Sequence, residues 1–126
     1  MSLKQIAVMF GIVFVVVGAL GWVPAVNPGG KLLGIFDVNP AHNVVHLATG
    51  VVAIIVGVMS EKASRVFFQV FGVIYGLVAV LGFYYGDAPL LGIVANNAAD
   101  SALHVVIAVI ALYLGLGMKS EAPAAS

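Results

Sequence analysis

Four long apolar stretches, each without lysine, arginine or glutamate, dominate this chain. They run approximately over Gln5–Trp22, Val44–Met59, Val66–Tyr85 and Leu103–Met118. A bilayer core of about 30 Å needs roughly 20 helical residues at about 1.5 Å each. The second and fourth stretches reach this length only if the polar residues before them belong to the helices. The sequence therefore predicts four transmembrane helices, two of which begin in polar segments.

The composition supports the membrane assignment. Hydrophobic residues make up 63% of the 126 residues and charged residues make up 8%, whereas soluble domains are roughly 45–50% apolar and about 25% charged. So few charges cannot cover the surface of a soluble domain of this length. We predict an all-α, integral membrane four-helix bundle with the lipid bilayer as its partner. Residues 1–118 would form its single domain, and the small and polar residues 119–126 a disordered tail.

The chain also resembles itself. Matching segments lie 61 residues apart early in each copy and 58 residues apart later, so the first copy has three extra loop residues. The matching pairs are 10–14 with 71–75, 18–22 with 79–83, 33–35 with 91–93, Asn39 with Asn97, and His46 with His104. This pattern predicts two repeated helical hairpins, over about 4–59 and 66–117. It also favours a retained helix over a signal peptide at the N-terminus, because a cleaved leader has no reason to repeat a mature helix.

Positive charge is unevenly distributed between the two sides of a four-span topology. One side carries Lys4, Lys62, Arg65 and Lys119. The other side carries only Lys31. By the positive-inside rule, the sequence predicts a multi-pass protein of the cell membrane with both termini in the cytoplasm. The short loop at 60–65 would also be cytoplasmic, and the loop at 23–39 would lie outside.

Both polar segments carry signals for a helix start. Asn39 followed by Pro40 offers an N-cap and a proline at the first helical position, where its missing N–H costs nothing. Asn97 offers a second N-cap, and Asp100 places an acid in the first turn, which the helix dipole favours. Asp100 therefore has two interpretations, as a capping residue near the water interface or as a ligand.

His46 and His104 lie about seven residues beyond these caps, which places both roughly 10 Å along their helices and inside the apolar zone. Ionisable side chains at this depth are rare and mark candidate functional sites. One interpretation is structural. Each imidazole would then bond to a carbonyl, an asparagine or the other histidine, and the cluster would hold the bundle together.

A second interpretation is a metal site. The candidate ligands are His42, His46, Asp100 and His104. They form two pairs with a spacing of four residues, so each pair projects from one helix face. The two helices run in the same direction and present both pairs at the same depth. Three imidazoles and one carboxylate suit a divalent transition metal such as zinc, iron, manganese or copper. A haem b held between His46 and His104 is a third interpretation.

Other polar residues near the histidines form a candidate polar network. Its members are Asn39, Asn43, Asn97 and Ser101, with Asn96 as a candidate extension. Cysteine is absent, which excludes disulfides and thiolate chemistry. The chain has no cluster of lysine and arginine that could follow a phosphate backbone, so nucleic acid is not an expected partner. It also has no nucleophile set, paired catalytic carboxylates or phosphate-binding loop, and we expect no enzymatic activity.

The two polar segments resemble a known family. Residues 39–50 are similar to the pattern Asn-x-x-His-Asn-x-x-His-Leu-x-x-Gly of the small bacterial membrane proteins called domain of unknown function 4383. Residues 97–104 fit a later pattern of that family, Asn-x-Ala-Asp-x-x-x-His, with Ser101 where an asparagine often follows the aspartate. The resemblance spans essentially the whole membrane region. It implies a four-helix integral membrane protein and supplies no function.

Two classes of function remain open. The first is a non-enzymatic membrane module whose His/Asp/Asn cluster, in the outer half, organises the bundle or binds a metal ion. The second is a transporter or redox component, in which the same cluster handles an ion, a proton or an electron; parallel repeats do occur in transporters. One copy of this chain offers little wall for a substrate path. Transport would therefore need a homo-oligomer, and a membrane partner fits the first class.

Overall fold

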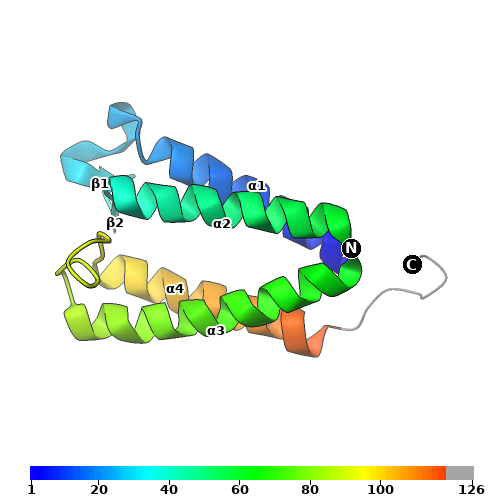
Figure 1. Ribbon diagram of the computed structural model, residues 1–126. Coiled ribbons are helices and arrows are strands. Elements are labelled where there is room, and N and C mark those ends of the chain that lie inside the picture. Colours follow the sequence, from blue (N-terminus) through cyan, green and yellow to red (C-terminus); the bar gives the residue numbers. More distant parts are fainter. Residues whose placement is uncertain (119–126) are drawn as a thin grey trace.

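The computed structural model describes residues 1–118, and the tail predicted at 119–126 lies outside the described residues. Within residues 1–118 there are four helices that are long and apolar enough to cross a membrane (Figure 1). They are α1 (Leu3–Leu20), α2 (Pro40–Met59), α3 (Glu61–Tyr85) and α4 (Ala98–Leu112), which continues into the π-helical turn η3 (Tyr113–Gly117). The predicted all-α, four-helix membrane fold is confirmed.

The helices form two antiparallel hairpins. α1 packs along α2, and α3 packs along α4 (Figure 1). A single residue, Ser60, connects α2 to α3. We call this end of the bundle the turn end, and the opposite end, which carries the two long loops, the loop end.

Each long loop contains a tight turn of the same kind. The first loop holds η1 (Pro24–Val26), η2 (Pro28–Gly30), β1 (Lys31–Leu32) and β2 (Phe36–Asp37). β1 and β2 pair antiparallel, with Leu32 opposite Phe36. In the second loop, Leu90 forms an isolated antiparallel bridge with Val94. Because Leu32 and Leu90 are both buried, each turn is anchored to the loop end of the bundle.

Capping side chains explain where α2 and α4 begin. Asn39 Oδ1 accepts a hydrogen bond from the backbone N–H of His42 (2.9 Å). Asn97 Oδ1 accepts one from the backbone N–H of Asp100 (2.8 Å). These bonds satisfy donors that a helix N-terminus leaves free. Both helices therefore begin directly after their asparagines, inside the polar segments, as the sequence predicted.

The starts of the other two helices differ from the apolar boundaries. α3 begins at Glu61 rather than at Val66, because the Ser60 hydroxyl oxygen accepts the N–H three residues later (3.0 Å). α1 begins before the predicted Gln5, because Gln5 and Ser2 form a capping box. Polar capping residues thus extend both helices beyond their apolar stretches.

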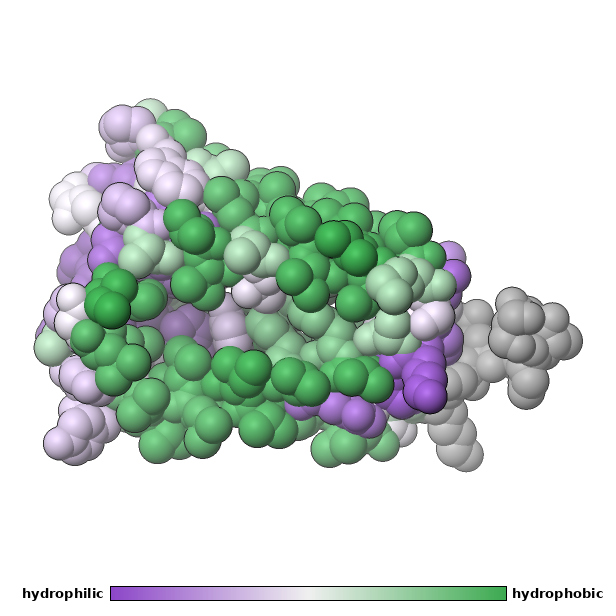
Figure 2. Space-filling model, in the orientation of Figure 1, coloured by the Kyte–Doolittle hydropathy of each residue, from purple (hydrophilic) through white to green (hydrophobic). Residues whose placement is uncertain are grey.

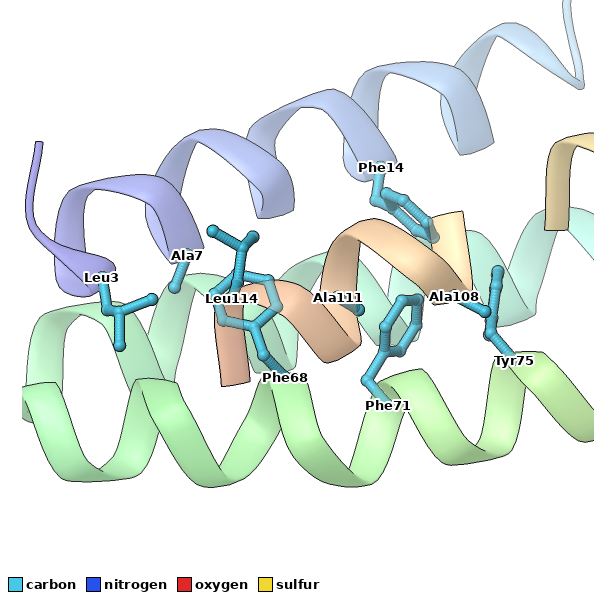
Figure 3. Close-up of a cluster of buried hydrophobic side chains, with 9 residues drawn as sticks. All are labelled: Leu3, Ala7, Phe14, Phe68, Phe71, Tyr75, Ala108, Ala111 and Leu114. Atoms are coloured by element: carbon cyan, nitrogen blue, oxygen red, sulfur yellow. The ribbon is translucent and has the colours of Figure 1, made fainter. Parts of the chain in front are cut away.

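The hydrophobic core joins the two hairpins (Figure 3). Phe14 of α1 meets Phe71 and Tyr75 of α3, with ring centroids 5.7 Å and 6.1 Å away. The small side chains of Ala108 and Ala111 let α4 approach this cluster closely. The cluster consists of Leu3, Ala7, Phe14, Phe68, Phe71, Tyr75, Ala108, Ala111 and Leu114. It therefore ties α1 to α3, α4 and η3.

The outer face of the helices is apolar. Figure 2 shows hydrophobic residues along the flanks of the bundle and hydrophilic residues gathered toward its two ends. Val58 of α2, Val80 of α3 and Leu116 of η3 are among the large apolar side chains that are exposed. A continuous apolar surface of this kind matches the hydrocarbon core of a bilayer.

Candidate functional site

Hydrogen bonds from two asparagines connect the hairpins at the loop end. Asn39 Nδ2, at the start of α2, donates to the carbonyl oxygen of Ile93 in the second loop (2.9 Å). Asn97 Nδ2, at the start of α4, donates to the carbonyl oxygen of Ile35 in the first loop (2.9 Å). Each asparagine therefore caps its own helix and also binds the loop of the other hairpin.

Asp100 completes the start of α4. It is only 2% exposed, and its Oδ2 accepts a hydrogen bond from the backbone N–H of Asn97 (3.1 Å). Together with the Asn97 cap this forms a reciprocal capping box. The carboxylate lies in the first turn, where the helix dipole favours negative charge. Asp100 thus acts as a capping residue.

His42 is buried and bonded to the first loop. Its Nδ1 donates to the backbone carbonyl oxygen of Asp37 (2.9 Å), which links β2 to the first turn of α2. In a neutral imidazole this bond places the proton on Nδ1 and leaves Nε2 as the acceptor. His42 therefore has one ring nitrogen engaged in holding the loop.

The remaining members of the predicted network lie on either side of these caps. Ser101 Oγ donates to Asn96 Oδ1 (3.2 Å), and both residues are buried. Asn43 is buried at the junction of α1 and α2, against Gly21, where a side chain would overlap the Asn43 amide. Asn39, Asn97 and Ser101 thus form cross-element hydrogen bonds, and Asn43 fills the space left by a glycine.

Asn96, the candidate extension of the predicted network, binds the end of α3. Its Nδ2 donates to the carbonyl oxygens of Gly82 (3.1 Å) and Gly86 (2.8 Å) at the end of α3. The last carbonyls of a helix need donors from outside it. The sequence offers Asn96 for the network but does not indicate that its partners are the last carbonyls of α3.

The imidazoles of His46 and His104 lie about two helical turns beyond the Asn39 and Asn97 caps. His46 stacks on Phe14 of α1, with ring centroids 4.8 Å apart and planes inclined by 21°. His104 meets Tyr75 of α3 edge to face, at 5.1 Å and 68°. The ring of His42 lies near both, at 4.9 Å from His46 and 6.3 Å from His104. The three imidazoles form one cluster lined by aromatic rings.

Two nitrogen atoms of this cluster have no partner. The Nδ1 atoms of His46 and His104 are buried and make no hydrogen bond. A buried polar atom left in this state costs about 1–3 kcal/mol. The structural interpretation in which every histidine bonds to a carbonyl, an asparagine or another histidine therefore fits His42 and does not describe these two atoms. The two imidazole rings instead contact the aromatic rings of Phe14 and Tyr75.

The arrangement does not support the predicted metal site. Among residues 1–118, no group of three or more His, Cys, Asp or Glu side chains could hold a metal ion. Two of the four predicted ligands have other partners, since Asp100 accepts from the Asn97 N–H and His42 donates to a loop carbonyl. Only His46 and His104 keep an unpartnered buried nitrogen, and two ligands are fewer than the predicted four.

One known family covers the helical region. A family model described as Domain of unknown function (DUF4383) matches residues 4–117. The chain belongs to this family. The DUF4383 match runs from the second residue of α1 to the end of η3 and confirms the resemblance seen in the polar segments. Comparisons with curated proteins and with solved structures give no match. Because the DUF4383 description names no activity, the function must be inferred from the site itself.

Proposed function

We propose that this DUF4383 protein is a non-enzymatic membrane module whose polar residues at the loop end organise the four-helix bundle. The exchange of hydrogen bonds between the hairpins carries the proposal, from Asn39 to the second loop and from Asn97 to the first. We call Asn39, Asn97 and Asp100 the capping layer. Helices in a bilayer gain no hydrophobic drive to associate, so packing and hydrogen bonds between them determine their arrangement. The capping layer supplies such bonds at the loop end, and the aromatic core supplies packing below it.

The backbone of the two loops supports a further part of the proposal, that the hairpins are copies of one unit. Leu33 and Leu91, 58 residues apart, have φ angles of 56° and 52°. A positive φ is uncommon outside glycine and unusual for a bulky residue. Gly34 and Gly92, the next residues, have φ angles of 73° and 74°. The same rare pair of conformations at equivalent positions is most simply explained by duplication.

The histidine contacts support duplication as well. His46 and His104 are 58 residues apart, and their aromatic neighbours Phe14 and Tyr75 are 61 residues apart. These are the two spacings of the sequence repeat. Each histidine contacts the aromatic ring of its own hairpin, at 4.8 Å and 5.1 Å. Equivalent residues are therefore in contact in both hairpins, although the rings are stacked in the first and edge to face in the second.

We propose that the turn end faces the cytoplasm, because Lys4, Lys62 and Arg65 lie within the first five residues of α1 and α3. The chain has no cysteine, so single cysteines can be introduced for labelling. A membrane-impermeant maleimide should label Ala25→Cys in intact cells and Ser2→Cys only after permeabilisation. The opposite pattern would reverse the orientation.

The organising role is tested by removing the amide donors and keeping the caps. Asn39→Ser and Asn97→Ser retain a side-chain oxygen that caps a helix well, but they lose the Nδ2 group. Each variant should lose about 0.5–1.5 kcal/mol of unfolding free energy in detergent, the usual contribution of one hydrogen bond. The two losses should be similar. An unchanged free energy of unfolding in both variants would contradict the organising role.

A second candidate function is a transporter or redox component, as the unpartnered Nδ1 atoms of His46 and His104 favour a bound group between the helices. Vesicle flux assays for protons and divalent ions, elemental mass spectrometry and the absorbance of haem test this candidate. Flux, metal or haem that is lost in both His46→Leu and His104→Leu would favour it over the module. A native protein that shows no flux, no bound metal and no haem absorbance would exclude this second candidate function.

A further inference from the structure

An apolar groove of about 710 Å³ lies between α2 and α3 and begins at the Ser60 turn. Figure 2 looks onto this face, where hydrophobic residues of the two helices flank a hollow and hydrophilic residues gather at the turn end. The walls include Val52 and Val56 of α2 and Val66 and Val70 of α3. The groove opens sideways, toward the surface that a bilayer would cover.

The groove is as long as one leaflet of a bilayer. On α3 the uncharged part of its lining runs from Ala63 to Ile74, eleven residues apart, which corresponds to about 16 Å at about 1.5 Å per residue. Half of a hydrocarbon core of about 30 Å is about 15 Å. An acyl chain of the leaflet on the turn-end side therefore has the right length and direction to lie in the groove.

One charged side chain lines the groove, and it lies at the mouth. Lys62 belongs to the first turn of α3 and is exposed. The neighbouring acid, Glu61, is directed toward α1, where its Oε1 accepts a hydrogen bond from the backbone N–H of Lys4 (3.4 Å). The Lys62 ammonium is thus at the level where a headgroup phosphate would lie if the acyl chain followed the groove. Lysines next to a membrane surface attract anionic lipids.

We propose that the α2–α3 groove binds an anionic phospholipid, with an acyl chain along the apolar walls and the headgroup phosphate at Lys62. The lipid comes from the leaflet on the turn-end side, which is the cytoplasmic leaflet in the orientation proposed above. The proposal does not depend on the function of the loop end, because no residue of the capping layer lines the groove.

Native mass spectrometry of the full chain can compare phosphatidylglycerol with phosphatidylcholine of the same acyl composition after delipidation. One phosphatidylglycerol should bind about fivefold more tightly than phosphatidylcholine, the effect of one lysine near an anionic headgroup. Lys62→Gln should abolish this preference. Lys31→Gln, which makes the same change at the loop end, should preserve it. Equal affinity of the native protein for the two lipids, or an unchanged preference in Lys62→Gln, would overturn the proposal.

A second variant tests the position of the acyl chain. Ala48 is exposed and lines the groove, so Ala48→Phe should fold normally and occupy space that the acyl chain needs. Both lipids should then bind more weakly than to the native protein. Unchanged lipid binding in Ala48→Phe would place the lipid elsewhere and overturn the proposal. A dimer that appears on delipidation and persists at saturating phosphatidylglycerol would assign the groove to a second copy instead.

Discussion

Gly11 of α1 and Gly50 of α2 face each other so closely that neither position has room for a methyl group. A Cβ atom on Gly11 would lie 2.5 Å from the Gly50 carbonyl oxygen, and a Cβ atom on Gly50 would lie 2.7 Å from the Gly11 carbonyl oxygen. These two carbonyl oxygens belong to the backbone, so they cannot move aside as a side chain can. Small residues that permit this approach are typical of helix pairs in membranes.

Gly11→Ala should therefore destabilise the protein by about 1–3 kcal/mol, the range observed when a well-packed interior is overfilled. Gly76→Ala in α3 is the matched control, because no atom lies within 4 Å of a Cβ atom at that position. Alanine is also the better helix former, so the control should be as stable as the native protein or more stable. Thermal unfolding in detergent measures both. Equal melting temperatures for the two variants would contradict the packing of α1 on α2.

His46→Leu and His104→Leu should have similar effects on stability, because each imidazole contacts one aromatic ring of its own hairpin and leaves a buried Nδ1 atom unpartnered. Replacing such a group by an apolar side chain removes an unfavourable burial, so each melting temperature should stay the same or rise slightly. Widely different effects in thermal unfolding would argue against a shared, pseudo-symmetric site. A large loss in both would indicate that the histidines hold a ligand.

Substitutions of Asp100 separate capping from ligand binding. Asp100→Asn keeps an oxygen that can accept the Asn97 N–H, so its unfolding free energy should be close to that of the native protein. Asp100→Ala removes the acceptor and should cost about 1 kcal/mol, as for other lost caps. Chemical or thermal unfolding gives this order. If Asp100→Asn were as damaging as Asp100→Ala, the carboxylate charge would be needed and a ligand role would gain support.

The fold could be predicted from the sequence because its signals are local. The caps at Asn39 and Asn97 act on residues three positions away, so the sequence alone indicates where α2 and α4 begin. The long apolar stretches likewise identify helices that must face lipid. The early starts of α1 and α3 were missed, because Ser2 and Ser60 extend those helices through polar residues that an apolar boundary leaves out.

The site was harder to predict because its bonds join distant residues to backbone atoms. Asn39 binds a carbonyl 54 residues away and Asn97 binds one 62 residues away. Every residue has a carbonyl oxygen, so no residue type in the sequence marks these acceptors. The prediction of a metal site was limited in the same way, because it could not take hydrogen bonds to backbone carbonyls into account. A spacing of four residues places His42 and His46 on one helix face, but it does not reveal that His42 already donates to the Asp37 carbonyl.

Distances between spin labels on the two hairpins test most directly whether the capping layer holds them together. A loop-end pair can be attached to cysteines at Val44 of α2 and Leu103 of α4, which are both exposed. A turn-end pair at Val58 of α2 and Leu116 of η3, also exposed, reports on the opposite end. The absence of native cysteine keeps the labelling specific.

In the double variant Asn39→Ser/Asn97→Ser, the distance distribution of the loop-end pair should become longer and broader, while that of the turn-end pair stays the same. Asn27→Ser is the control, because the Asn27 amide donates only to carbonyls close to it in the chain, at 2.6 Å and 2.7 Å, and its loss should change neither distribution. A loop-end distribution that is identical in the native protein and the double variant would contradict the organising role of the capping layer.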